Sequence, residues 1–374
     1  MSIVVGIDFS EHSRQAARVA AVLARMLGTR LELIHVIDPW IEHAFTGDLG
    51  RVTGPAEQHL QAERDALVRS FGVDVRAEVR VGIPDEEIAR KALDAGSTLV
   101  VTSALGWRTE AHWRLGGIAE RLARHTRVPF LTVRDPRPFL EWSEGKRPLR
   151  VMVGDDLGRI SNAALQWLSV LRHAGPCEVV VAHVYLPVLE HRRLGLSFAR
   201  EREVQAVLEK EVQTRVEGQV PGGAQVRVEP GLGLATESLL DVAKEQGADL
   251  IVLGTHQFGT GRRLWQGSVS QAVLREAPTS VACVPLAASA LKQPEIPPVR
   301  RVLVSTDFSD LGNQAIPHAY ALAPEGGEVV LLSVVEISIS DARSPQAPDA
   351  YPESRRQLEA LVPASAVKRG IKTT

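Results

Sequence analysis

The chain has 374 residues, of which 44% are hydrophobic and 24% charged, and its formal net charge at pH 7 is -2. This charge balance gives no electrostatic reason to expect nucleic acid or an anionic membrane as a partner, and the length suits two or three globular domains. A strand pattern begins within two residues of Met1, leaving no room for a signal peptide, and no apolar run approaches the ~20 residues of a membrane span. We therefore expect a cytoplasmic protein.

The first part of the chain shows strands that alternate with helices. Strands are predicted at Ile3–Asp8, Leu31–Val36, Val73–Val81, Leu99–Thr102 and Val128–Val133. Helices are predicted at Ser13–Leu27, Ala56–Phe71, Pro84–Ala95 and Arg108–His125, with Ser10 as the N-cap and Gly28 at the C-cap of the first. This alternation implies crossover connections and a parallel sheet with helices on both faces.

The opening of this pattern occurs three times, each time as an apolar run that ends in an aspartate. The three runs are Val4–Ser10, Val151–Leu157 and Val302–Ser309. Asp8 to Asp156 is 148 positions and Asp156 to Asp307 is 151, far above the ~20 to 50 residues of a solenoid repeat. The repeating object is therefore a whole domain.

We predict three repeats with these limits: the first at 1–136, the second at 149–286 and a partial third at 299–374. The second repeat has strands predicted at Val179–Val184, Asp249–Gly254 and Ser280–Pro285. Proline-containing linkers, Asp135–Pro148 and Leu286–Pro298, separate the repeats. The third repeat offers a strand at Val329–Val335 and a helix around Ser354–Val362, and the sequence stops where a third strand would begin, so about half a domain is lacking.

Ligands of an open parallel α/β sheet bind beyond the carboxyl ends of the strands, where the strand order reverses. In the second repeat this rule points to Asp156 after the first strand, to Val184 after the second, and to the glycine-rich loop from Gly254 to Ser270. Glycines let a backbone approach an anion closely, and the free N–H groups at a helix N-terminus favour phosphate. Ser268 and Ser270 would add hydroxyl donors.

These residues resemble the universal stress proteins, whose ATP-binding members carry Gly-x2-Gly-x9-Gly-Ser/Thr after the fourth strand and an aspartate after the first. The resemblance covers two full repeats and the first half of a third. It rests on the three aspartate-ended strands, on His35–Asp38 and His183–Val184, and on Gly267–Ser270. It implies an open, mostly parallel five-stranded sheet of the Rossmann-like, adenine-nucleotide alpha-hydrolase-like type, repeated in tandem.

Neither copy of the loop matches this motif completely. In the second repeat Gln257 replaces the second glycine, and its Cβ could obstruct the backbone approach. In the first repeat Ser103 replaces the first glycine, and Gly117 occupies the position where the motif has a serine or threonine. The positions that match are Gly254, Gly267 and Ser268 in the second repeat and Gly106 and Gly116 in the first. Binding is expected mainly in the second repeat, and the third repeat, which has no such loop, cannot hold ATP by itself.

The resemblance implies a role for each matching position if ATP or AMP binds, with Mg²⁺ as an optional companion ion. Asp156 would hydrogen-bond the nucleoside and the backbone of Val184 would read the adenine edge. Ribose and phosphates would be held by Gly254, Gly267, Ser268 and Ser270. The counterparts in the first repeat are Asp8, Val36, Gly106 and Gly116. Asp155 adds a carboxylate beside Asp156, which would repel phosphate unless it points away or shares a cation.

Other residues of the chain favour no catalytic chemistry. His35, His183 and His256 have no base, nucleophile or metal ligand at fixed spacing, so packing or capping is expected. Cys177 and Cys283 lack the spacing of a metal site and are expected to be buried structural thiols. The sequence has no Gly-Lys-Ser/Thr loop and no clear general base, so fast ATP hydrolysis is not expected.

Two functions remain open at this point. The first is a nucleotide-responsive stress protein, in which ATP or AMP acts as a regulatory ligand. The second is a nucleotide-free interaction scaffold with degenerate loops. For either function, the resemblance implies that the fifth strands, Val128–Val133 and Ser280–Cys283, pair with each other, which would make the first two repeats an internal pseudo-dimer. A homodimer is a further possibility.

Overall fold

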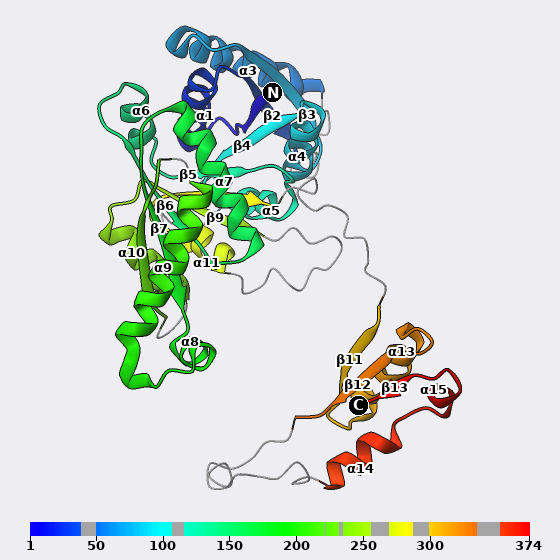
Figure 1. Cartoon of the computed structure of the whole chain (residues 1–374). Helices are drawn as coiled ribbons and strands as arrows, with labels where there is room; N and C mark the ends of the chain where they lie inside the picture. Colours follow the sequence, from blue (N-terminus) through cyan, green and yellow to red (C-terminus); the bar gives the residue numbers. More distant parts are fainter. Residues whose placement is uncertain are drawn as a thin grey trace. The chain divides into compact units, whose positions relative to one another are not determined.

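The computed structural model describes residues 1–38, 50–106, 116–220, 222–231, 235–255, 269–286, 299–334 and 352–374. The chain divides into two compact parts, Met1–Ala290 and Leu291–Thr374 (Figure 1). The first part contains one ten-stranded sheet and the second a three-stranded sheet. The first two repeats therefore share one sheet, and the third has its own.

The first repeat has the predicted alternation of strands and helices. Its strands are β1 (Ser2–Gly6), β2 (Arg30–Ile37), β3 (Val75–Val81), β4 (Ser97–Ser103) and β5 (Phe130–Val133). Its helices are α1 (Glu11–Met26), α3 (Gly50–Phe71), α4 (Pro84–Asp94) and α5 (Gly117–His125). The strands are all parallel, in the order β3-β2-β1-β4-β5. The strand order reverses between β1 and β4, which places the candidate ligand site beyond their carboxyl ends.

The second repeat has the same strand order, β8-β7-β6-β9-β10. Its strands are β6 (Leu149–Gly154), β7 (Cys177–Tyr185), β8 (Gln225–Pro230), β9 (Leu250–Thr255) and β10 (Ser280–Pro285). Its helices are α7 (Arg159–Ala174), α8 (Pro187–Leu194), α9 (Glu201–Gln219), α10 (Ala235–Glu245) and α11 (Val269–Glu276), with a 3-10 turn at Phe198–Arg200. Its reversal point lies between β6 and β9.

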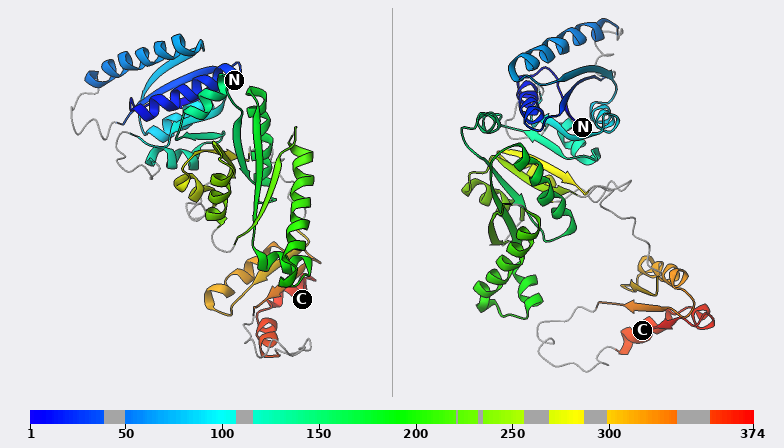
Figure 2. Two further views of the ribbon diagram at one scale, coloured as in Figure 1. Left: turned by 90° about the vertical axis from the view of Figure 1, so that its left-hand side faces the viewer. Right: turned by 45° about the horizontal axis from the view of Figure 1, so that its top comes forward.

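The two repeats meet through the predicted pairing of their fifth strands. β10 runs antiparallel to β5, with Ala282 opposite Leu131, and the right-hand view of Figure 2 shows the yellow β10 alongside the teal β5. Arg134 reinforces this contact, since its Nη2 donates to the carbonyl oxygens of Leu274 and Arg275 at the end of α11. The pseudo-dimer expected from the resemblance is thus present inside one chain.

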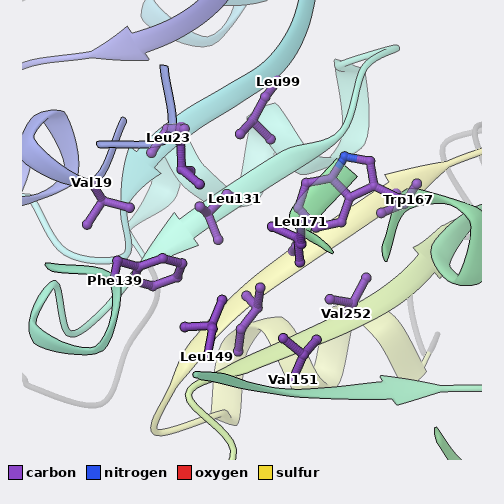
Figure 3. Close-up of a cluster of buried hydrophobic side chains, with 14 of the residues drawn as sticks. Val19, Leu23, Leu99, Leu131, Phe139, Leu149, Val151, Trp167, Leu171 and Val252 are labelled. Carbon is purple, nitrogen blue, oxygen red and sulfur yellow. The ribbon is translucent and has the colours of Figure 1, made fainter. Parts of the chain in front are cut away.

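Two hydrophobic cores, one on each face of the ten-stranded sheet, extend through both repeats. Helices α1, α3, α7 and α9 cover one face, and α4, α5, α10 and α11 cover the other. Figure 3 shows the first core at the junction, where Leu23 of α1 and Leu171 of α7 lie among side chains from the strands of both repeats. Because each core crosses the junction, the first two repeats form one compact part. The predicted limits between the repeats stay a prediction.

The segment between the first two repeats, which we predicted as a linker, contains a helix. This helix, α6 (Arg137–Ser143), buries Phe139 and Trp142 in the junction core. Trp142 Nε1 donates to the carbonyl oxygen of Pro176 at 2.8 Å. Proline is tolerated in the first turn of a helix, so Pro138 does not prevent this structure. The second predicted linker lies, apart from Leu286, outside the described residues.

The third repeat has its own small sheet of parallel strands in the order β11-β12-β13. Its elements are β11 (Arg301–Ser305), α12 (Asp310–Asn313), α13 (Ala315–Leu322), β12 (Glu328–Leu332), α14 (Pro352–Ala360), α15 (Ala364–Lys368) and β13 (Lys372–Thr373). The third strand begins where the sequence pattern predicted it. Across the described residues of the chain, none of the helices has the length and apolar character needed to cross a membrane.

Asp249, just before β9, gives the first compact part a predicted sensitivity to acid. Arg147 Nη1 lies 2.6 Å from its Oδ2, and the Arg150 amide donates to the same oxygen at 2.9 Å. Burial alone would raise the pKa of this carboxyl, but these hydrogen bonds lower the pKa below its ordinary value of 3.8. The pKa of this carboxyl is lower in the folded protein than in the unfolded chain. The carboxylate therefore stabilises the fold at pH values above the pKa of the unfolded chain, and this stabilisation is lost as the pH falls through the pKa of the folded protein.

We therefore expect the free energy of unfolding to decrease below about pH 4. The Asp249→Asn variant, which has no carboxyl to protonate, should show a shallower decrease. Urea titrations at a series of acidic pH values measure both slopes. If the free energy of unfolding falls equally steeply with decreasing pH in the wild type and in the variant, Asp249 is not a source of the acid sensitivity.

Candidate functional site

Each of the three aspartates opens the same turn just beyond its strand. The following residue has a positive φ, which is uncommon for a residue other than glycine: +62°, +60° and +65° at Phe9, Leu157 and Phe308. The amide two positions after the aspartate donates to its Oδ1, at 3.0, 2.8 and 3.0 Å from Ser10, Gly158 and Ser309. Since the third repeat shares this turn, the aspartate has a structural role even without a phosphate loop.

In the first repeat, three of the predicted site residues lie together beyond β1 and β4. A Cβ on Gly106 would be 3.1 Å from Asp8 Oδ2, and one on Gly116 would be 3.7 Å from the Gly106 amide nitrogen. The Gly116 amide also donates to the Ala104 carbonyl oxygen at 2.7 Å, which draws the two ends of the loop together. Val36 lies near the carboxyl end of the neighbouring β2. The residues between Gly106 and Gly116 are outside the described ranges.

In the second repeat, Asp156 is exposed and keeps one oxygen available. Its Oδ1 accepts from the Gly158 amide and from Ser161 Oγ at 2.6 Å, whereas its Oδ2 receives no hydrogen bond from any described residue. A carboxylate oxygen in this state can accept hydroxyl hydrogens from a ligand. The predicted site residues Gly267 and Ser268, together with Gln257 and His256, lie outside the described residues.

Gly254 and Ser270 contact each other at the two ends of the second loop. Ser270 Oγ donates to the Gly254 carbonyl oxygen at 2.9 Å. A Cβ on Gly254 would overlap the carbonyl group of Ile160 in α7, so glycine is needed at this position for packing. The structure therefore adds to Gly254 a role that the phosphate motif did not predict.

Asp155 does not face the candidate phosphate site, because it is buried and paired. Arg215 Nε from α9 lies 3.2 Å from Asp155 Oδ2, and Arg215 also donates to the carbonyl oxygens of Leu157 and Gly158. Ser161 Oγ lies 2.5 Å from Asp155 Oδ1 and 2.6 Å from Asp156 Oδ1, so its single hydroxyl hydrogen is shared between the two carboxylates. Arg215 thus holds the turn that carries Asp156. Sequence reasoning missed this arginine, although a second acid at the end of a buried strand signals that a cation must lie nearby.

Val184, the predicted adenine reader, lies at the carboxyl end of β7 beside a glycine. A Cβ on Gly231 would be 3.0 Å from Val184 Cγ1, and the Gly231 amide donates to the Tyr185 carbonyl oxygen at 2.7 Å. The first repeat has the same closure, since the Gly82 amide donates to the Ile37 carbonyl oxygen at 3.0 Å. In both repeats a glycine amide therefore donates a hydrogen bond to the carbonyl oxygen of the last residue of the second strand.

His35, His183 and both cysteines have structural positions. His35 Nδ1 donates to the Ile7 carbonyl oxygen at 2.8 Å and His183 Nδ1 to that of Asp155 at 2.7 Å, which confirms their predicted capping role. Burial raises the pKa of Cys283 to about 12 and that of the half-buried Cys177 to about 11. Thiols with such pKa values are unreactive at neutral pH. Within the described ranges, no three His, Cys, Asp or Glu side chains gather as metal ligands would.

Comparison with known proteins identifies the family. The model of the universal stress protein family matches residues 1–134 and 149–285, which is more than half of the chain. The chain belongs to the universal stress protein family. A universal stress protein of Mycolicibacterium smegmatis is 26% identical over 293 residues, which cover 75% of this chain and 96% of that protein. The matched residues of the family model are those of the first two repeats.

Solved structures agree on the fold. The crystal structure of a universal stress protein from Archaeoglobus fulgidus covers 76% of this chain and 98% of its own, with a TM-score of 0.56 and 18% identity. Another universal stress protein, solved in complex with cAMP, covers 36% of this chain and 96% of its own, with a TM-score of 0.30 and 23% identity. The likeness to the Archaeoglobus fulgidus structure, at 18% identity, supports the α/β fold of the first two repeats and no more than the fold.

Proposed function

We propose that this universal stress protein is a nucleotide-responsive regulator, in which ATP or AMP binds mainly in the second repeat. The observation that carries the proposal is Asp156, an exposed residue just beyond β6 whose Oδ2 accepts no hydrogen bond from a described residue, at the reversal point between β6 and β9. Asp155 does not oppose an anion there, because Arg215 neutralises its charge. In this proposal Asp156 and Val184 bind the nucleoside, and Gly254, Gly267, Ser268 and Ser270 bind ribose and phosphates.

The first repeat supports a second, weaker site. Asp8 and Gly106 lie against each other, and Asp8 Oδ1 already accepts from the amide and the hydroxyl of Ser10. We propose that Asp8, Val36, Gly106 and Gly116 form this site. In both repeats the nucleotide acts as a regulatory ligand, since the sequence has no Gly-Lys-Ser/Thr loop to clamp a transferring phosphate. A cytoplasmic location stays a prediction.

Release of bound nucleotide tests the proposal directly. The purified protein should release ATP or AMP in near-stoichiometric amounts when denatured, as measured by chromatography of the supernatant. Gly267→Val should weaken ATP binding at least tenfold in a calorimetric titration, because a branched side chain blocks the approach of phosphate to the backbone.

Gly116→Val in the first repeat is the matched control. Its φ is -64°, and a Cβ there would meet no described atom closer than 3.4 Å outside its own neighbours, so the fold should tolerate the change. This variant should leave the main binding event intact. If the protein releases no nucleotide and shows no titration signal, the interaction scaffold is the better description of its function.

A further inference from the structure

Helix α11, which begins at the phosphate end of the proposed site, is held by the other repeat at its first turn. Gln271 Nε2 donates to Glu120 Oε1 of α5 at 3.1 Å, and Gln271 is only 5% exposed. Arg124 Nη2 donates to the same oxygen at 2.6 Å, which gives Glu120 a neighbouring cation. A hydrogen bond from a buried amide to a carboxylate is stronger than one between two neutral groups. The first repeat therefore fixes the start of α11.

The first repeat also holds the last turn of α11. Arg134 directly follows β5, and its Nη2 lies 3.3 and 3.2 Å from the carbonyl oxygens of Leu274 and Arg275. The last carbonyl groups of a helix have no partner within it and lie at the negative end of its dipole, where a cation is favourable. The Arg134 amide donates to Ser280 Oγ at 3.1 Å, which fixes Arg134 against the start of β10. Both ends of α11 are thus tied to the first repeat.

The contact made by Arg134 has no equivalent from the second repeat to the first. Gly116 and Gly267 occupy the same position of the glycine motif and are 151 residues apart. By this count the counterpart of Arg134 is Pro285, the last residue of β10. Proline has no donor in its side chain, so Pro285 cannot give α5 the hydrogen bonds that Arg134 gives α11. This support therefore goes to the helix of the main proposed site.

The two contacts matter because α11 is the element next to the proposed phosphate-binding groups. Gly267 and Ser268 directly precede α11, and Ser270 lies in its first turn. Ser270 Oγ donates to the Gly254 carbonyl oxygen at 2.9 Å, so a shift of α11 would also disturb the end of β9. Groups on a helix bind a ligand precisely only when neighbouring side chains lock that helix in place. For α11, part of this locking comes from the first repeat.

We propose that Glu120 and Arg134 are positioning residues for the nucleotide site of the second repeat, so that the first repeat controls how tightly this site holds phosphate. The inference rests on the proposed function, because it concerns the same site. Asp156 follows β6 and Val184 lies in β7, so neither proposed contact with the nucleoside is carried by α11. Loss of a positioning residue should therefore weaken binding of the phosphates and leave binding of the nucleoside unchanged.

Calorimetric titrations with ATP and with adenosine separate positioning from a general loss of structure. The full-length Gly116→Val protein serves as the parent, so that the titration reports on the second repeat. Adding Arg134→Met should weaken ATP binding about fivefold or more and change the affinity for adenosine less than about twofold. Glu120→Ala should do the same, although loss of a negative charge by itself favours ATP. Glu120→Gln keeps an acceptor for Gln271 and should restore most of the ATP affinity.

Arg275→Met is the matched control for Arg134→Met. It removes the same charge from α11 itself, and because the Arg275 side chain is exposed, the bond from Arg134 to its carbonyl oxygen remains. Both affinities should be unchanged in this control. Equal ATP affinities of the parent, Arg134→Met and Glu120→Ala would overturn this inference alone, and so would an equal loss for ATP and adenosine. A parent that binds no ATP would overturn the proposed function and this inference with it.

Discussion

Replacing Arg215 by methionine is expected to lower the free energy of unfolding by about 3–5 kcal/mol, the usual cost of leaving one member of a buried ion pair without its partner. The Asp155 side chain is completely buried, and Arg215 supplies its countercharge at 3.2 Å. The variant would also lose the hydrogen bonds from Arg215 to the carbonyl oxygens of Leu157 and Gly158. Urea unfolding followed by tryptophan fluorescence measures the loss.

The double variant Asp155→Ile/Arg215→Met provides the control. Isoleucine already stands at this position in the first repeat, where Ile7 is buried in the same core. Replacement of a whole buried pair by apolar side chains is often neutral or stabilising, so the double variant should regain most of the stability. A single variant that loses less than about 1 kcal/mol would show that Asp155 does not depend on this arginine.

Trp142→Ala is expected to destabilise the first compact part by about 3–5 kcal/mol, because it removes a large buried side chain at the junction of the two repeats. The cavity would lie in the core beneath α6, next to Phe139. Trp142→Phe keeps most of the ring but loses the hydrogen bond to Pro176, so its cost should be smaller, with about 1 kcal/mol from that bond.

Tryptophan fluorescence is a suitable probe for both experiments. All six tryptophans lie within Met1–Ala290, so the signal reports on the ten-stranded sheet and not on the third repeat. Substitutions at exposed positions usually change the free energy of unfolding by no more than about 0.5 kcal/mol. A change this small for Trp142→Ala would contradict the role of α6 in the junction core.

Local patterns predicted most elements correctly, because strands and helices leave periodic apolar signals over a few residues. The Ser10 cap is confirmed, with its side chain accepting from the Ser13 amide, and β10 has its predicted bounds. The helix at Phe139 and Trp142 was not predicted, because prolines in a short segment between repeats are typical of a linker. Its burial depends on side chains from both repeats, which are distant in sequence.

The three aspartate-ended strands show where sequence reasoning is sufficient and where it is not. The sequence by itself determined the repeat, the order of strands and helices along the chain, and the resemblance to the family. These features depend on short-range periodicity and on motif spacing. Only the tertiary structure decided that Arg215, 60 positions after Asp155, neutralises that carboxylate, and that Phe139 and Trp142 of α6 are buried in the core shared by both repeats. Both depend on which distant groups become neighbours when the chain folds, and burial then determines whether a charge is paired or an apolar side chain is covered.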